Sequence, residues 1–203
     1  AIPAWKLAPA LLCGNTVVLK PSSETPLCAI ELVKILLAAG IPPSVVNLVT
    51  GSGDIVGMSL ITHPLVRAIS FTGSREIGLQ ITQYAGVKKV GLELGGKNAI
   101  IVMDDADLDL AVDGILWGAF GTTGQRCTAT SRVIAHTAII SSLTRKLLAR
   151  MKTLTLGDGL HATTNVGPLI NEAAVEKSTM YCAVGINEGA TLLCGGKRIP
   201  RRG

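Results

Sequence analysis

The chain has 203 residues, 48% of them hydrophobic, which is enough for one large domain or two modest ones with a substantial core. Its formal net charge is +5, but it holds only two Phe, two Tyr and two Trp, so it offers no stacking platform for bases. Nucleic-acid binding is therefore not expected. No apolar run reaches the roughly 18 residues of a membrane span, and no membrane association is predicted.

The cysteines indicate a reducing compartment. They are odd in number and form no C-x-x-C pair, in a chain too long to need disulfide staples. We therefore expect a cytoplasmic protein. His136 and His161 lack partners at ligand spacing, so no metal site is predicted.

The first part of the chain alternates helices and strands. Residues 4–12 predict a packed helix, and residues 16–20, short and β-branched, predict a buried parallel strand that ends at Pro21. A second strand is expected over residues 45–49. With a helix between them, these strands form a βαβ unit, which places ligands at the carboxyl ends of its strands.

The helix between these strands has start and stop signals. Thr25 is expected to cap it, with Pro26 at its first position, and Gly40 is expected to end it. The predicted apolar face consists of Leu27, Ile30, Val33 and Leu37.

Two glycine-containing turns follow strands. Residues 51–57 read G-x-G-x-x-x-G, one residue longer than the dinucleotide-binding fingerprint, and Asp54 could simply cap the next helix. Farther on, a strand over residues 66–71 leads into Gly73 and Ser74, with a helix from Arg75. Helix N-termini bind anions, so these two residues are placed to hold a pyrophosphate; the alternative is an ordinary serine cap.

A fourth strand, over residues 88–94, carries Glu93 in an apolar, glycine-rich setting suited to a general base. We expect a domain boundary just beyond it, and then a strand over residues 99–103. The acidic cluster 104–107 is interpreted as a helix cap rather than a metal site, because acidic residues favour helix N-termini. The helix that it begins is expected to reach Gly121.

Residues 124–129, Gly-Gln-Arg-Cys-Thr-Ala, place Cys127 among small and polar neighbours. An accessible thiol beside Arg126 can act as a nucleophile, since cations and helix N-termini favour the thiolate. We expect the preceding loop to deliver Cys127 at or near the start of the next helical segment. The alternative is a buried, inert cysteine. A strand over residues 133–135 and an amphipathic helix over 139–151 should follow.

Four segments occur in the order and approximate spacing of one enzyme superfamily. They are Val18-Leu19-Lys20-Pro21-Ser22, Phe71-Thr72-Gly73-Ser74, Glu93-Leu94-Gly95-Gly96-Lys97 and Gly124-Gln125-Arg126-Cys127. Each is weak alone, but together they resemble the NAD(P)-dependent aldehyde dehydrogenases, from Ala1 to about Gly196. The resemblance implies an α/β fold with part of a doubly wound, Rossmann-like nucleotide-binding domain at 1–94 and part of the α/β catalytic domain at 95–203. It also implies that the chain is incomplete, and weakly active or inactive alone.

The resemblance further implies that Cys127 is the catalytic thiol, that Glu93 is the general base, and that the cofactor is NAD or NADP. Lys20 would face the adenosine ribose, although most lysines are simply solvated. Ser23 stands where NAD-preferring members commonly have a glutamate, so a 2′-phosphate, and hence NADP, is allowed; the neighbouring Glu24 is the other candidate ribose partner. The remaining implied contacts are Gly51 and Gly53 with the adenosine half and Gly73 and Ser74 with the pyrophosphate.

The implied reaction oxidises a small aldehyde to a carboxylate through a cysteine thioester. Residues 124–132 are similar to those of enzymes that oxidise acid semialdehydes such as α-ketoglutarate semialdehyde, and Arg126 could hold a substrate carboxylate bidentately. Alternatively, Arg126 turns inward to a backbone carbonyl or a structural carboxylate.

Other interpretations remain open. An acylating aldehyde dehydrogenase would pass the thioester to phosphate or coenzyme A, but Glu93 favours water; glutamyl phosphate reductases lack this Glu93 context. An inactive fragment is the non-enzymatic alternative. Unpaired strand edges tend to associate, so we expect a homo-oligomer or association with the missing segments.

Overall fold

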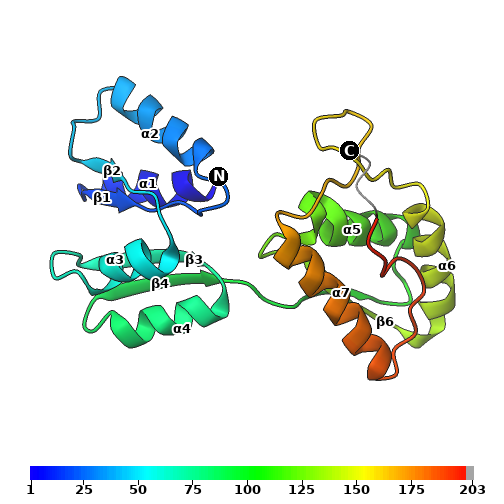
Figure 1. The fold of residues 1–203 in the computed structure, drawn as a ribbon. Helices are drawn as coiled ribbons and strands as arrows, with labels where there is room; N and C mark the ends of the chain where they lie inside the picture. Colours follow the sequence, from blue (N-terminus) through cyan, green and yellow to red (C-terminus); the bar gives the residue numbers. More distant parts are fainter. Residues whose placement is uncertain (200–203) are drawn as a thin grey trace. The chain divides into compact units, whose positions relative to one another are not determined.

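The computed structural model describes residues 1–199 and divides into two compact units, Ala1–Gly95 and Gly96–Gly203, of which the last four residues lie outside the described part. Both units are α/β, and their strands pair in parallel (Figure 1). Among the described residues, no helix combines the length and apolar character needed to cross a membrane.

The first unit contains, in order, α1 (Ile2–Leu12), β1 (Val17–Leu19), α2 (Leu27–Ala38), β2 (Val46–Leu48), the π-helical turn η1 (Gly53–Gly57), α3 (Met58–Thr62), β3 (Ala68–Gly73), α4 (Arg75–Tyr84) and β4 (Lys89–Leu94). These are the alternating elements that the sequence predicts, with boundaries shifted by one or two residues. β1 pairs with β2 and β3 with β4, each as a two-stranded parallel sheet.

The β1–β2 pair packs against α1 and α2 around Leu7, Val33 and Val46, which are all buried. The prediction that the first strand is buried is only half correct. Val17 and Leu19 pack against this core, whereas Val18 is 46% exposed. Successive side chains in a strand point to opposite faces, and only one face of this sheet is covered by the core cluster.

The α2 helix corrects two predictions. Pro26, not Thr25, occupies its N-cap position, and the cap carries no side-chain hydrogen bond. Leu27 and Leu37 of the predicted apolar face are exposed, while Leu32 and Leu36 pack against the core instead. Because apolar residues surround this helix, their spacing alone did not identify its inner face.

The β3–β4 sheet separates an apolar face from a polar one. Ile69, Phe71, Val90 and Leu92 pack on the core of Ile61, Ile81 and Ala85. The register pairs Ser70 with Gly91 and Thr72 with Glu93, so these four residues share the opposite face. The candidate base therefore projects from the face that does not pack on the core.

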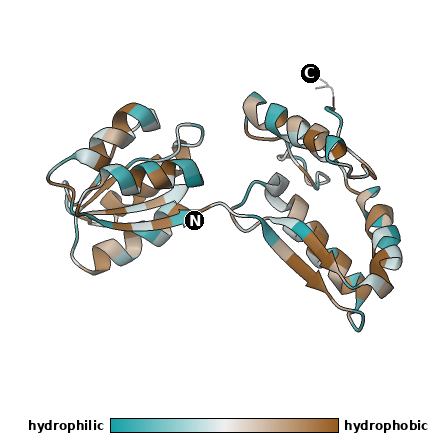
Figure 2. Cartoon of the chain, turned by 90° about the horizontal axis from the view of Figure 1, so that it is seen from below, coloured by the Kyte–Doolittle hydropathy of each residue, from teal (hydrophilic) through white to brown (hydrophobic). Residues whose placement is uncertain are grey.

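The second unit contains, in order, β5 (Asn98–Val102), α5 (Leu108–Phe120), the 3₁₀ turns η2 (Gly121–Gly124) and η3 (Thr137–Ile139) with β6 (Thr130–Ala135) between them, α6 (Ile140–Met151) and α7 (Glu172–Asn187). β5 and β6 are parallel, and the hydrophobic residues in the later part of each strand are visible in brown in Figure 2. The α7 helix was not predicted; its residues are largely exposed, so the sequence carries no strong apolar period.

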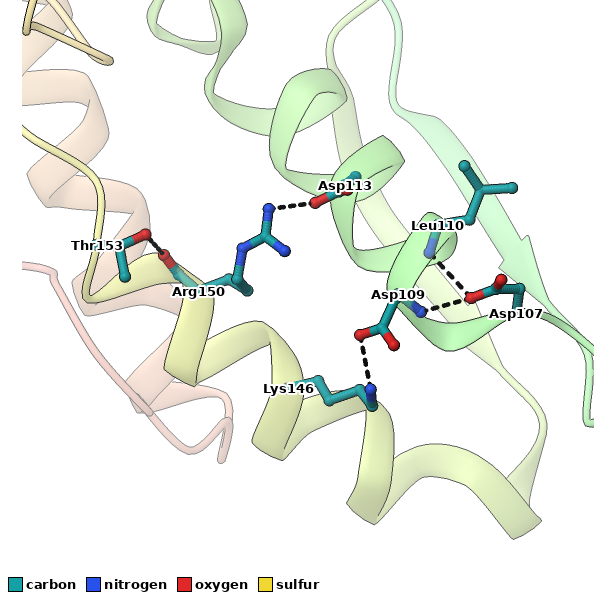
Figure 3. A network of polar contacts seen from close by, with 7 residues as sticks. All are labelled: Asp107, Asp109, Leu110, Asp113, Lys146, Arg150 and Thr153. Atoms are coloured by element: carbon teal, nitrogen blue, oxygen red, sulfur yellow. Dashed lines mark hydrogen bonds and ion pairs between the residues drawn. The ribbon is translucent and has the colours of Figure 1, made fainter.

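The core of the second unit lies between β5, α5 and α6, around Val102, Val112, Ile115 and Leu143. As predicted, the acidic cluster caps α5: the Asp107 carboxylate accepts from the N–H groups of Asp109 and Leu110, at 2.9 and 3.2 Å. Figure 3 shows this cap together with two ion pairs that join α5 to α6, Lys146–Asp109 at 2.6 Å and Arg150–Asp113 at 2.5 Å. All four of these charged side chains are partly exposed, so the two pairs contribute little to stability.

Candidate active site

Cys127 lies in a turn between η2 and β6, with its side chain exposed. The Ala129 N–H donates to the Arg126 carbonyl at 3.0 Å and closes this turn. The prediction that Cys127 begins a helical segment is wrong, because a strand follows from Thr130. The β-branched residues of this strand pair with β5, and that pairing outweighs any local helical tendency.

The backbone just before Cys127 is left-handed over three consecutive residues. The φ angles are +54° at Thr122, +56° at Thr123 and +70° at Gly124. Only glycine adopts this region freely, and a Cβ at Gly124 would come within 2.6 Å of the Ala119 carbonyl oxygen. A β-branched residue there is a genuine outlier, and such strain persists only where the surrounding structure holds it.

One contact that holds this segment comes from Gln125. Its side-chain oxygen accepts a hydrogen bond from the Ile170 N–H at 3.2 Å, and its amide nitrogen donates to the Thr123 hydroxyl. The loop that leads to the candidate nucleophile is thus tied to the segment just before α7.

Arg126 turns inward. Its guanidinium lies over the Trp117 ring and donates to the Trp117 carbonyl oxygen at 3.2 Å, and its Nε is buried with no hydrogen-bond partner among residues 1–199. A Cβ at Gly121 would come within 2.1 Å of the Trp117 ring, so the close approach depends on that glycine. Arg126 therefore makes the inward contact with a backbone carbonyl that was the alternative to substrate binding. Its role in binding a substrate carboxylate stays a prediction.

Glu93 is exposed, although the sequence predicted an apolar setting for it. Strand alternation explains the difference, because its neighbours Leu92 and Leu94 point to the other face. Its charged neighbour is Lys6 of α1, which sequence reasoning missed. Burial lowers the pKa of Lys6, and the Glu93 carboxylate acts in the opposite direction.

Lys6 reaches the polar face of the β3–β4 sheet and donates to the Ser70 hydroxyl at 2.8 Å. Gly91, paired with Ser70, leaves the position between Ser70 and Glu93 without a side chain. The only sequence signal for this arrangement is a single lysine in an otherwise apolar helix.

Three predicted cofactor contacts meet at one point of the first unit. Lys20, directly after β1, donates to the carbonyl oxygens of Pro21 at 2.6 Å and of Gly51 at 3.4 Å. The Ser23 hydroxyl donates to the same Gly51 oxygen at 3.1 Å. Gly51 itself has φ +139°, and a Cβ there would lie 2.5 Å from a Val56 methyl group. The structure thus brings Lys20, Ser23 and Gly51 together, whereas Glu24 makes a local contact from its N–H to the Ser22 hydroxyl.

The other predicted cofactor residues lie at the next two turns. Gly53 begins η1, and a Cβ there would meet nothing within 4 Å. Asp54 is not the cap of this helical segment, because the Ser52 hydroxyl accepts from the Ile55 N–H at 3.3 Å. The Ser74 hydroxyl likewise accepts from the Ile77 N–H at 3.3 Å at the start of α4, as the serine-cap alternative states.

Comparison with known proteins decides the family. The sequence model of the aldehyde dehydrogenase family matches residues 1–203, the whole chain. The chain belongs to the aldehyde dehydrogenase family. The superfamily resemblance found in the sequence is thereby confirmed.

Among curated aldehyde dehydrogenase relatives, the α-ketoglutaric semialdehyde dehydrogenase of Bacillus subtilis strain 168 is 46% identical over 201 residues, covering 98% of this chain and 41% of the relative. The 2,5-dioxopentanoate dehydrogenase of Saccharolobus solfataricus is 44% identical over 207 residues, covering all of this chain and 43% of the relative. The chain therefore spans about two fifths of the length of the curated relatives that it matches.

Solved aldehyde dehydrogenase structures confirm the fold. Betaine aldehyde dehydrogenase from Staphylococcus aureus, in complex with NAD⁺, superposes with a TM-score of 0.95 at 41% identity, over 98% of this chain and 40% of that one. Glyceraldehyde-3-phosphate dehydrogenase from Methanocaldococcus jannaschii, complexed with NADP, gives 0.95 at 40% identity, over 98% of this chain and 44% of the other. The α/β fold class predicted from the sequence is correct.

Proposed function

We propose that this chain carries the central part of an enzyme that oxidises an aldehyde to a carboxylate with NAD(P), with Cys127 as nucleophile and Glu93 as general base. The observation that carries the proposal is an exposed cysteine presented by a strained, tethered turn in a chain of this family. Residues with strained backbone conformations are often found at functional sites, where the surrounding contacts hold them in place.

The residues of the first unit fit a dinucleotide. Lys20 and Gly51 follow strands that pair in parallel, Gly73 is the last residue of another such strand, and Ser74 is the N-cap of α4, a helix of ten residues. We propose that Lys20 and Ser23 face the adenosine ribose, Gly51 and Gly53 allow close backbone approach, and Gly73 and Ser74 hold the pyrophosphate. When bound, the nicotinamide supplies the hydride acceptor. The neutral Ser23 admits NADP as well as NAD.

The chain's own chemistry would then follow the order of bonds formed and broken. The Cys127 thiolate adds to the aldehyde carbonyl and forms a tetrahedral thiohemiacetal oxyanion. Loss of hydride from this carbon leaves a thioester on Cys127. Glu93 takes a proton from water as that water attacks the thioester, and the carboxylate product and the free thiol are released.

Acyl transfer tests the assignment without any cofactor. An activated ester such as p-nitrophenyl acetate should acetylate Cys127, as mapped by mass spectrometry of its peptides, and Cys127→Ser should abolish that adduct. Glu93→Gln should let the thioester accumulate, because the base for hydrolysis is removed. Acetylation that falls first on Cys13 or Cys194, both also exposed, would contradict the nucleophile assignment.

Cofactor turnover separates the enzyme from the inactive fragment. Mixing the chain with NADP and an aldehyde, and following absorbance of the reduced cofactor, should show little or no activity if residues outside this segment are needed. Adding phosphate or coenzyme A tests the acylating alternative, in which acyl phosphate or acyl-CoA replaces the free acid.

Finer assignments belong to the same proposal. We infer that residues 1–94 belong to the nucleotide-binding domain and 95–203 to the catalytic domain, and that the protein is cytoplasmic. We also propose that copies of the chain associate, since each strand of the described part pairs on one edge only. A single 21.0 kDa species in sedimentation would contradict this association.

The substrate that we propose is an acid semialdehyde. Support comes from the names of the two curated relatives and from Arg126, a cation next to the nucleophile in the chain. Direct competition between a semialdehyde and an uncharged aldehyde of equal length, in an active enzyme that contains this segment, measures the preference.

A further inference from the structure

The side-chain amide of Asn98, the first residue of β5, contacts the turn that carries Cys127. Its nitrogen donates to the Cys127 carbonyl oxygen at 2.7 Å and to the Ala129 carbonyl oxygen at 3.2 Å. Both partners are acceptors, so the nitrogen must face them, and its two hydrogens match the two oxygens. One side chain thus fixes both ends of the Cys127–Ala129 segment.

The strand pairing at this point is irregular. Asn98 pairs with Thr130, but the next residue of β5, Ala99, pairs with Arg132, so Ser131 is an extra residue on β6. The Ser131 hydroxyl lies 3.5 Å from the Asn98 carbonyl oxygen. A bulge of this kind re-aims neighbouring side chains, and bulges are over-represented next to active sites.

A second anchor lies one residue away. The Arg132 guanidinium donates from its Nε to the Lys97 carbonyl oxygen at 2.9 Å, which holds the chain just before Asn98. The start of β5 is therefore tied to β6 by Arg132 while its Asn98 side chain reaches back to the turn. Contacts from the start of β5 therefore hold the backbone of Cys127, while its thiol remains exposed.

We propose that Asn98 is a positioning residue that holds the backbone of Cys127 through its amide, an inference that rests on the proposed role of Cys127 as nucleophile. Without the two donated hydrogen bonds, the turn gains conformations in which the thiol leaves the position that this backbone gives it. Cys127 then reacts like any exposed thiol.

Competitive alkylation of the chain by iodoacetamide tests this inference. The rate at Cys127 is compared with that at Cys194, an exposed thiol of the same unit, and the half-buried Cys182 reports the integrity of the unit. Asn98→Leu, which keeps the bulk but removes both donors, should lower the Cys127 to Cys194 rate ratio by about threefold to tenfold, as expected for the loss of one or two hydrogen bonds. Asn98→Gln keeps the amide donors and should retain most of the ratio.

The matched control is Asn47→Leu in the other unit, because the Asn47 amide also donates to a backbone carbonyl, that of Ser44 at 2.8 Å. This variant should leave the ratio unchanged. If Asn98→Leu unfolds the unit, seen as faster labelling of Cys182, then Asn98→Ala, which also lacks side-chain donors, takes its place and the same criterion applies. A ratio within twofold of wild type in the donor-deficient variant, or a Gln variant as low as Leu, overturns the inference. A wild-type chain in which Cys127 reacts no faster than Cys194 overturns the nucleophile assignment and this inference with it.

Discussion

Arg126 directly precedes the candidate nucleophile in the chain, and its guanidinium carbon lies 3.7 Å from the centroid of the Trp117 ring. The same guanidinium donates to the Trp117 carbonyl oxygen. The last turns of α5 are therefore joined to the turn of Cys127 by a stacked cation and a hydrogen bond from one side chain.

A double-mutant cycle should detect this stacking. Arg126→Met and Trp117→Leu, singly and together, should give a coupling energy of about 0.5–1 kcal/mol in urea unfolding, the usual range for a partly exposed cation–π pair. Trp117 is 59% exposed, which keeps the expected value at the lower end. Strict additivity of the two substitutions would show that the stacking contributes nothing to stability.

If Arg126 binds the substrate carboxylate, its removal should affect KM for charged and uncharged substrates differently. In an active enzyme that contains this segment, Arg126→Leu should raise KM for an acid semialdehyde much more than for an uncharged aldehyde of similar length, by about 1.5–3 kcal/mol if a charged hydrogen bond is lost. Equal effects on the two substrates would leave Arg126 with the structural role that its contacts to Trp117 describe.

The left-handed threonines predict a stabilising substitution. Thr122 has φ +54° and ψ +40°, where a β-branched residue is disfavoured and glycine is not. Thr122→Gly should raise the free energy of unfolding of the second unit by about 1 kcal/mol, the lower end of the cost of such a conformation. The same change at Thr179, inside α7, should instead destabilise by a few tenths of a kcal/mol, about the difference in helix propensity. Urea titrations of both variants give the comparison, and a destabilised Thr122→Gly would contradict it.

Gly51 and Gly53 form a matched pair for the nucleotide site. Gly51→Ala introduces a Cβ at φ +139°, 2.5 Å from a Val56 methyl group, whereas at Gly53 an added Cβ meets nothing within 4 Å. Gly51→Ala should therefore destabilise the first unit by about 1–3 kcal/mol and weaken NADP binding. Gly53→Ala should leave the stability of the first unit nearly unchanged. Calorimetric titration of this variant with NADP then shows whether the nucleotide occupies the open space beside Gly53. Equal stability of the two variants would show that the turn relaxes around the added methyl group.

The lowered pKa of Lys6 should make the free energy of unfolding depend on pH. Burial lowers its pKa from the ordinary 10.5, so between the folded value and 10.5 the unfolded chain binds more protons than the folded one. The free energy of unfolding therefore rises with pH across that window, and below it the cost of burying the charge is fully present. Lys6→Met should flatten this rise in urea unfolding, while Lys34→Met, on an exposed residue paired with Glu31, should not.

Glu93→Gln extends the same test. The Glu93 carboxylate raises the pKa of Lys6, so its removal should lower that pKa further and widen the window towards neutral pH. If the pH profile of Glu93→Gln matches that of wild type, the two charges do not interact in solution.

The amino-acid sequence by itself determined the family, the α/β class and most of the local elements. The cap at Asp107, the stop at Gly40 with φ +96° and the strands β1 to β6 depend on short-range spacing, turn chemistry and β-branching, which are readable along the chain. The motifs around Lys20, Glu93 and Cys127 likewise consist of neighbouring residues. Periodicity failed at α2 and α7, where residues are apolar all round or exposed all round.

Only the tertiary structure decided which distant groups meet. The Lys6 ammonium reaches Ser70 from 64 positions away, and the Asn98 amide reaches Cys127 across 29. The inward turn of Arg126, the exposure of Glu93 and the strand after Cys127 are decided in the same way. A side chain finds its hydrogen-bond partners through packing and strand register, and a local pattern of residues does not encode either of these.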